Sequence, residues 1–362
     1  MNPEPQSLNS PAAGALEAYG WTQAIADNYL AQAGPGDRLV RVARVDRASS
    51  VVATPTGVTE CRSGPPELAP VTGDWAIART TSDGRLALDR LLPRTTSVVR
   101  TNATSTGEQL LAANVDTMFI LHGIDRPHRV GRLERLAILS WDAGVSPVIV
   151  LTKIDLAASD DAVISVDEAA SEIDNVIFDI PVVPVSSLTG LGIDRLKPYL
   201  LPGHTIGLVG ESGAGKSSLA NRLAADAVQA TGATRHTDHK GRHTTTSRDL
   251  VPIPGGSVLL DTPGLRSISM PVAANGLARA YADLDALMTE CRFRDCGHRA
   301  EPGCRIKAAL RDGDLEPARW AGYQKLQREI AFEQRRVTER ERRSESRSSR
   351  RRRQTAPSID EW

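Results

Sequence analysis

Long apolar runs are absent from this chain of 362 residues, and its first ten residues, MNPEPQSLNS, lack the basic region and apolar stretch of a signal peptide. A helix that crosses a bilayer needs about 20 consecutive apolar residues, and a secreted chain carries a leader of the missing kind. We therefore expect a soluble, cytoplasmic protein that has no membrane partner.

Cysteine is scarce as well. The chain has four cysteines, which are too few for a disulfide scaffold at this length. Three of them crowd between Cys291 and Cys304 with a histidine among them, which indicates a metal site. Cys61 has no partner near it in the sequence, and we expect it to be an inert residue of the N-terminal domain.

The net charge is zero, but the charges are unevenly spread. Ten arginines and three glutamates lie between Arg335 and Arg353, whereas every charged residue from Asp155 to Asp179 is acidic. A basic, serine-rich segment with few apolar residues cannot offset its ordering entropy, so residues 340–362 are predicted to be disordered. Two interpretations of this tail stay open: it contacts RNA, or it is a solvated extension.

The chain is long enough, and with 40% apolar residues rich enough, for two or three domains. Residues 1–36 are predicted to be a leader, with a helical pattern over Ala15–Ala31 that ends before a Gly-Pro-Gly turn. Residues 37–103 contain five short strand patterns, which predict a small all-β barrel of the OB-fold type, with an SH3-like barrel as the alternative. These strands are expected at Leu39–Val45, Ser50–Ala53, Gly57–Cys61, Asp74–Thr80 and Arg85–Leu88.

Residues 104–271 alternate apolar strand patterns with helical patterns, which is typical of an α/β domain built on a mostly parallel sheet. Strands are expected at Thr117–Leu121, Pro147–Leu151, Val182–Pro184, Thr205–Val209 and Ser257–Leu260, and helices at Val130–Asp142, Ser165–Asp174 and Lys216–Ala225. Residues 272–332 are predicted to be a mostly helical domain around the cysteine cluster, and residues 333–362 an arginine-rich tail.

A phosphate-binding loop follows the strand pattern at Thr205–Val209. Its sequence fits GxxxxGK[ST], in which backbone N–H groups and the start of a helix face the phosphates of a nucleotide. Lys216 is expected to bridge the β- and γ-phosphates during catalysis, and Ser217 to bind Mg²⁺. The predicted nucleotide contacts of this loop are Gly210, Glu211, Ser212, Gly213, Ala214, Gly215, Lys216, Ser217 and Ser218.

A second phosphate-reading motif, Asp261-Thr-Pro-Gly264, ends the strand pattern at Ser257–Leu260. An aspartate at this place suits a contact to Mg²⁺ through water, and the N–H of the glycine suits sensing of the γ-phosphate during catalysis. Between the two motifs lies a run of three threonines, of which Thr245 is the expected Mg²⁺ ligand.

Guanine recognition is predicted in a loop that follows the strand pattern at Pro147–Leu151. Asp155 of this loop can accept hydrogen bonds from the N1–H and the exocyclic amino group of guanine, whereas adenine presents an unfavourable acceptor. The expected base contacts are Thr152, Lys153, Ile154, Asp155, Ser186 and Ser187. These residues precede the phosphate loop, which reverses the usual order. A parallel sheet tolerates this circular permutation because strand neighbours, not chain order, set the geometry of its carboxyl edge.

The metal site is predicted at Cys291, Cys296, His298 and Cys304, which supply three thiolates and one imidazole within fourteen residues. Four such ligands make a closed tetrahedral set for one structural Zn²⁺, with no position left for a catalytic water. We expect the zinc ion to hold together a small domain that is poor in apolar residues.

Together these motifs resemble the RsgA family of circularly permuted GTPases that depend on the small ribosomal subunit, over about Asp37 to Ile330. The likeness includes Val71–Asp74, Leu91–Arg94, Ala113–Asp116, Gly241–Thr246 and Cys296–Cys304. The resemblance implies an OB-fold, a permuted GTPase domain and a zinc domain. It also implies that a monomer binds GTP or GDP, the 30S subunit and 16S rRNA, and that hydrolysis, stimulated by the subunit late in its maturation, releases the factor.

Two positions depart from ordinary GTPases. Thr152 replaces the more common asparagine, a change that is expected to weaken the tether of the base-reading loop, although the family accommodates it. Leu265 stands where many GTPases carry a water-positioning glutamine, so the catalytic side chain must come from elsewhere. His243 is the candidate, and the alternative is that it contacts rRNA or caps its loop.

The sequence therefore predicts a GTP hydrolase that acts as an assembly checkpoint. The second hypothesis is an RNA-binding, translation-associated factor in which GTP is a static ligand. A third hypothesis, an ATP-dependent kinase or ATPase, is disfavoured by Asp155.

Overall fold

The structure is a computed structural model that describes residues 14–101, 108–127, 129–159, 162–177, 179–231, 249–253, 255–261 and 274–354. Three residues with predicted roles, His243, Thr245 and Gly264, lie outside these ranges. The chain divides into two compact units, residues 1–270 and 271–362. Among the helices of the described ranges, none combines the length and the apolar character that a membrane crossing requires.

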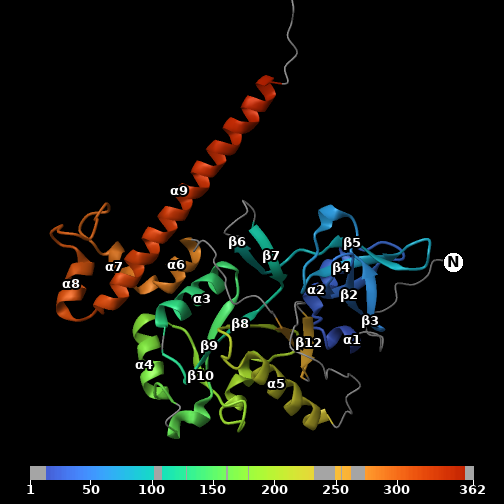
Figure 1. Cartoon of the computed structure of the whole chain (residues 1–362), viewed down its shortest axis with the longest axis horizontal. Coiled ribbons are helices and arrows are strands. Elements are labelled where there is room, and N and C mark those ends of the chain that lie inside the picture. The colour runs from blue at the N-terminus through green and yellow to red at the C-terminus, as the bar shows by residue number, and fades with distance from the viewer. Residues whose placement is uncertain are drawn as a thin grey trace, which may run out of the picture. The chain divides into compact units, whose positions relative to one another are not determined.

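The first unit opens with a closed five-stranded barrel, the blue part of Figure 1. The strand order is β1-β2-β3-β5-β4, in which β3 and β5 are parallel and β4 closes the barrel against β1. This order matches the predicted OB-fold rather than the SH3-like alternative. The strands are β1 (Arg38–Val45), β2 (Ser49–Thr54), β3 (Gly57–Arg62), β4 (Trp75–Thr80) and β5 (Leu86–Leu91), with a short 3-10 helix η2 (Pro66–Leu68) before β4.

The leader packs on the barrel instead of standing apart from it. The single helix expected over Ala15–Ala31 is two helices, α1 (Gly14–Glu17) and α2 (Gln23–Leu30). They are separated at Gly20, whose φ of +83° is a left-handed value that favours glycine. Apolar side chains of both helices and of the turn between them join one hydrophobic cluster with outer residues of the barrel: Leu16, Tyr19, Trp21, Ile25 and Tyr29 with Leu39, Trp75 and Ile77.

A six-stranded sheet follows, with the order β10-β9-β8-β11-β13-β12. All neighbours are parallel except β12, which lies antiparallel to β13 at the edge. The mostly parallel sheet confirms the prediction. The strands are β8 (Thr117–Gly123), β9 (Ser146–Thr152), β10 (Val182–Pro184), β11 (Thr205–Gly210), β12 (Asp249–Ile253) and β13 (Ser257–Asp261).

Helices cover both faces of this sheet, so the central strands β8 and β11 are buried along their whole length. Successive side chains of one strand face opposite ways: Ile120 packs in the cluster that contains Leu136 and Ile173, whereas Phe119 packs in the one that contains Leu219. The first cluster includes α3 (Val130–Asp142) and α4 (Val166–Val176), and the second includes α5 (Lys216–Thr231) and the 3-10 helix η4 (Ile193–Tyr199). Ser165 caps the start of α4, because its hydroxyl accepts a hydrogen bond from the N–H of Glu168.

One buried arginine joins the barrel to the sheet. Arg41 of β1 is 1% exposed, and its Nη2 donates to the Thr205 hydroxyl at the start of β11, 2.6 Å away. Its Nη1 donates to the carbonyl oxygen of Tyr19, and its guanidinium lies 5.0 Å from the centre of the Trp75 ring. Burial, only partly opposed by Asp116 and Asp74, lowers the pKa of Arg41 to about 10, so the side chain is charged at neutral pH.

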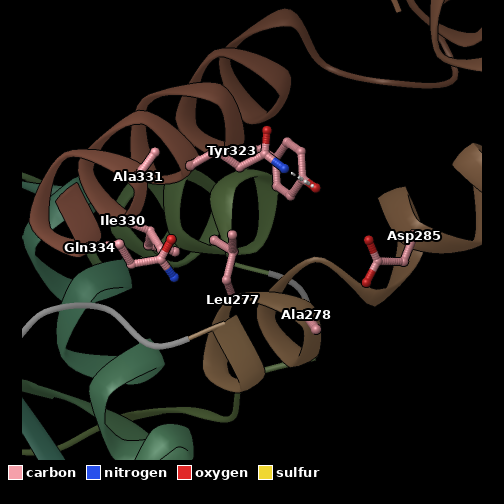
Figure 2. A pocket seen from close by; sticks show the side chains of 8 residues that line it. Leu277, Ala278, Asp285, Tyr323, Ile330, Ala331 and Gln334 are labelled. Atoms are coloured by element: carbon pink, nitrogen blue, oxygen red, sulfur yellow. Dashed lines mark hydrogen bonds between the residues drawn. The ribbon is translucent and has the colours of Figure 1, made fainter. Parts of the chain in front are cut away.

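The second unit consists of α6 (Ala274–Ala280), α7 (Ala282–Thr289), α8 (Arg305–Asp312) and the long helix α9 (Pro317–Gln354), which is red in Figure 1. Arg319 of α9 donates to Asp283 at 2.7 Å and lies 4.7 Å from the centre of the Tyr281 ring, which fixes α9 against α7. Figure 2 shows the groove between α6 and α9, where Leu277 faces Ile330 and Ala331.

The predicted disorder from Arg340 onward is not what the structure shows, because α9 continues to Gln354. Arginine and glutamate are good helix formers, and a low apolar content prevents burial without preventing a helix. Residues 355–362 lie outside the described ranges.

Candidate nucleotide site and metal centre

The phosphate loop, residues 210–217, joins the carboxyl end of β11 to the start of α5. At Gly210 φ is +153°, and a Cβ atom would lie 2.5 Å from the carbonyl oxygen of Leu121, so only glycine fits. Because α5 begins at Lys216, the N–H groups of its first turn adjoin the loop. Such a loop followed by a helix start is suited to bind an anionic phosphate chain.

The ammonium group of Lys216 is held by the loop itself. It donates to the carbonyl oxygens of Gly210 at 2.8 Å and of Glu211 at 2.6 Å. The cation therefore lies beside the turn in which phosphate oxygens would be bound.

The base-reading loop follows β9 and continues into the 3-10 helix η3 (Ile154–Ala158). Lys153 has a φ of +63°, which turns the chain between strand and helix. Asp155 accepts a hydrogen bond from the hydroxyl of Ser186, which follows β10, and that hydroxyl accepts one from the N–H of Thr189. Asp155 is therefore oriented from the neighbouring strand. The buried hydroxyl of Ser187 has no hydrogen-bond partner within the described ranges.

Thr152 ties the two loops together. Its side chain is 1% exposed, and its hydroxyl lies 2.9 Å from the carbonyl oxygen of Ala214 and 3.3 Å from that of His122. Threonine at this position therefore reaches the phosphate loop, and whether its tether is weaker than that of asparagine stays a prediction.

Two residues that sequence reasoning missed connect the same loops. Asp125 and Arg126 follow β8, which lies between β9 and β11. Asp125 accepts a hydrogen bond from the ammonium of Lys153 at 2.5 Å. Arg126 donates to the carbonyl oxygens of Ser212 at 2.9 Å and Gly213 at 3.1 Å. Their place directly after a buried parallel strand was the available signal, since ligands bind at the carboxyl edge of such sheets.

The charges of this edge are arranged as a network. Arg126 also donates to Asp125 at 3.1 Å, and Glu211 of the phosphate loop pairs with Arg132 at 2.8 Å. Partial burial works against ionisation of Asp125, but the hydrogen bonds from Arg126 and Lys153 outweigh it and lower its pKa to about 2. Asp125 is thus a fixed negative charge between two cations.

The predicted magnesium ligands are only partly within the described ranges. Ser217 lies in the first turn of α5, and Asp261 is the last residue of β13, which pairs in parallel with β11. A hydroxyl and a carboxylate are the oxygen ligands that Mg²⁺ prefers, so these two residues fit the ion chemically.

The four predicted zinc ligands converge. Ligand atoms of Cys291, Cys296, His298 and Cys304 all lie within 4.8 Å of one another. The Nδ1 atom of His298 lies 3.6 Å from the Sγ atoms of both Cys291 and Cys304. Bond lengths of about 2.3 Å to sulfur and 2.0–2.1 Å to nitrogen at a tetrahedral angle give a separation of about 3.6 Å. The cluster is therefore compatible with a Zn²⁺ site that uses Nδ1 of the histidine.

Comparison with known proteins covers the part of the chain that holds the nucleotide site. The family model of the RsgA GTPase matches residues 91–271. The small ribosomal subunit biogenesis GTPase RsgA of Opitutus terrae is 40% identical over 298 residues, which cover 79% of this chain and 80% of that protein. The chain belongs to the RsgA GTPase family. Its RsgA relative in Streptomyces coelicolor, which has the same descriptive name, is 39% identical over 87% of this chain and 86% of that protein.

Solved structures share the fold of this RsgA GTPase. YjeQ from Thermotoga maritima aligns with a TM-score of 0.60 at 24% identity, over 82% of this chain and 99% of that one. YloQ, described as a circularly permuted GTPase, aligns with a TM-score of 0.60 at 23% identity, over 83% and 98%. Membership of the family makes this chain a GTP hydrolase, and GTP hydrolysis implies Mg²⁺ beside the nucleotide.

Proposed function

We propose that this RsgA GTPase binds the small ribosomal subunit through 16S rRNA, hydrolyses GTP late in the maturation of that subunit, and is released when hydrolysis has taken place. The names of its relatives, small ribosomal subunit biogenesis GTPases, support the partner. The hydrogen bond between Thr152 and Ala214 is the observation that carries the nucleotide-binding part of the proposal, because it joins the base-reading loop to the phosphate loop.

The proposed contacts to GTP follow from this geometry. Asp155, oriented by Ser186, accepts hydrogen bonds from the guanine edge. The N–H of Ser187 donates to the guanine oxygen. The backbone N–H groups of residues 210–218 surround the β-phosphate, and Lys216 exchanges its carbonyl partners for oxygens of the β- and γ-phosphates.

Hydrolysis requires that charge on the γ-phosphate be stabilised and that a water molecule be oriented. We assign Ser217, Thr245 and Asp261 to hold Mg²⁺, which neutralises charge on the phosphates. Gly264 donates its N–H to the γ-phosphate, and His243 orients the attacking water in place of the glutamine that Leu265 replaces.

The proposed division of labour follows the predicted segments. The barrel, residues 37–103, and the zinc domain, residues 272–332, contact rRNA, and residues 104–271 form the GTPase. Only eight residues of sequence separate Leu265 from the start of α6 at Ala274. This short covalent path can transmit the state of the nucleotide to the zinc domain.

Turnover of GTP and ATP, with and without purified small subunits, tests the proposal. We expect hydrolysis of GTP alone, stimulated by the subunit, and release from the subunit with GTP but retention with a non-hydrolysable analogue. Equal release with the analogue would instead support an RNA-binding factor for which GTP is a static ligand.

The assignment of His243 is tested separately. His243→Ala should abolish the turnover stimulated by the small subunit while GTP affinity stays near that of the unmodified chain. Intact turnover would reject this role and leave an rRNA contact or a loop cap.

A further inference from the structure

Helix α9 changes character after Ile330. Before that residue one side of the helix is buried, with Tyr323 and Leu326 in the core of the second unit. Figure 2 shows Tyr323, Ile330 and Gln334 along the side that adjoins the groove. From residue 331 onward every α9 side chain whose burial is described is exposed, including Phe332 at 60%.

The arginines of this exposed part are not spread evenly around the helix. Each residue advances by about 100°, which places nine of the ten arginines between Arg335 and Arg353 on one half of the circumference, with Glu339 as the only glutamate there. The opposite half holds Arg352, two glutamates, three serines and a threonine. We call the first half the arginine face. A tail selected only for solubility would not need such segregation.

The arginine face continues the solvent side of α9. Because about 3.6 residues make a turn, 18 residues make five complete turns. Glu341, Ser344 and Ser348 therefore stand in line with Tyr323, Leu326 and Ile330, the buried side. Arg350 stands in line with the exposed Phe332. The positions of the arginine face thus lie on the half of the α9 circumference opposite to the one that holds Tyr323, Leu326 and Ile330.

A polar helix without packing partners is only marginally stable, and like charges on one face destabilise it further. A polyanion alongside would remove this repulsion. Guanidinium groups bind phosphate with paired hydrogen bonds. At about 1.5 Å per residue, residues 335–353 span about 27 Å, which is enough to follow a series of phosphates. The guanidinium carbon of Arg336 lies 5.7 Å from the centre of the Phe332 ring, so this ring adjoins the arginine face.

We propose that the arginine face of α9, residues 335–353, binds the phosphates of double-helical RNA without reading its sequence. The choice of RNA as the polyanion rests on the function proposed above. Double-helical RNA fits because proteins recognise it by shape and through its backbone, which suits a row of arginines that lies on a rod.

The test compares the unmodified full-length chain with a full-length variant of the same net charge. The face-swap variant exchanges three neighbouring pairs, through Arg343→Ser with Ser344→Arg, Arg347→Ser with Ser348→Arg, and Arg350→Ser with Ser349→Arg. It keeps composition and net charge but moves three arginines to the opposite half. The probe is a labelled RNA duplex of about 16 base pairs, the length that a double-stranded RNA-binding domain covers. A chain truncated after Gln334 gives the background of the other domains.

We expect truncation and face-swap to weaken duplex binding at least about tenfold, and the dependence on salt to become shallower because fewer counterions are released. Basal GTP hydrolysis should not change in either variant. Equal affinity of the face-swap variant and the unmodified chain would overturn the proposal, since net charge alone would then explain binding. Stronger binding to vesicles rich in phosphatidylserine than to the duplex would overturn it in favour of a membrane. If small subunits fail to stimulate GTP hydrolysis, the proposed function fails, whereas the duplex measurement still decides this inference.

Discussion

The hydroxyl of Thr152 donates a hydrogen bond of 2.9 Å to the carbonyl oxygen of Ala214. The first residue ends β9 and the second belongs to the phosphate loop after β11, so the contact spans the strand between them. Because Thr152 is buried, water cannot easily replace the bond, and the geometry of the base-reading loop depends on that of the phosphate loop.

This contact predicts that Thr152→Val weakens nucleotide binding. Valine keeps the shape of threonine but leaves the carbonyl oxygens of Ala214 and His122 without this donor. Loss of a buried hydrogen bond costs about 1–3 kcal/mol, so we expect GTP affinity to fall about tenfold. Titration with a fluorescent GTP analogue measures the effect. Thr152→Ser, which retains the hydroxyl, should bind nearly as the unmodified chain does, and equal affinity of the valine variant would exclude the tether.

Asp125 provides a prediction about ionisation. Its pKa of about 2 lies below the ordinary 3.8 because hydrogen bonds from Arg126 and Lys153 outweigh the effect of burial. Arg126→Met should therefore raise the pKa of Asp125 toward its ordinary value, and carbon-13 NMR of the carboxyl group measures it. Arg129→Met is the control, because it removes the positive charge of an exposed arginine four residues after Asp125, and it should shift this pKa less.

The same carboxylate contributes to stability in a defined pH range. Its folded pKa is depressed, so the contribution is fully present above about pH 4 and is lost as pH falls through about 2. Asp125→Asn should lower the unfolding free energy of the first unit by about 1–2 kcal/mol at pH 7. Urea unfolding at pH 7 measures this loss, and no loss would show that the ion pairs contribute nothing net.

The junction between the barrel and the sheet predicts energetic coupling between Arg41 and Thr205. Their side chains form a buried hydrogen bond of 2.6 Å at the start of the strand that ends in the phosphate loop. A double-mutant cycle with Arg41→Met and Thr205→Val should give an interaction energy of about 1–3 kcal/mol in the unfolding free energy. If the effects of the two substitutions on the unfolding free energy are additive, the hydrogen bond does not couple the stability of the barrel to that of the sheet.

The cysteine cluster predicts one zinc ion per chain. Cys304→Ser removes one of four ligands, so we expect zinc content measured by atomic emission to fall and proteolysis to increase within residues 271–362. Cys61→Ser is the matched control because this thiol lies in the barrel, where burial raises its pKa to about 11. Zinc content that is unaffected by Cys304→Ser would refute the ligand set.

Much of the fold could be predicted because apolar runs bounded by turns mark buried parallel strands. Two elements have the predicted bounds in the structure, the strand Val182–Pro184 and the helix Val130–Asp142. The hairpin β6 (Ser97–Thr101) and β7 (Glu108–Ala113) and the edge strand β12 were missed. Edge strands lack a continuous apolar run, and β12 contains Pro252, which argues locally against a strand.

The residues of the candidate site were likewise predicted only in part. Motifs with fixed spacing identified the phosphate loop, the base-reading loop and the zinc ligands, because backbone geometry dictates those spacings. Asp125 and Arg126 belong to no motif, and their roles arise only from the pairing of β8 between β9 and β11. Single-sequence reasoning cannot supply such contacts between strands far apart in the chain.

The most direct test of the account changes the base that is recognised. Xanthine has an oxygen where guanine has its exocyclic amino group, so Asp155→Asn presents an amide donor to xanthine and loses the paired acceptor for guanine. We predict that this variant binds GTP at least about 100-fold more weakly and binds xanthosine triphosphate better than GTP, while the exposed control Asp167→Asn behaves as the unmodified chain. Unchanged GTP affinity in Asp155→Asn would show that the loops at Thr152 and Gly210 do not share one guanine nucleotide.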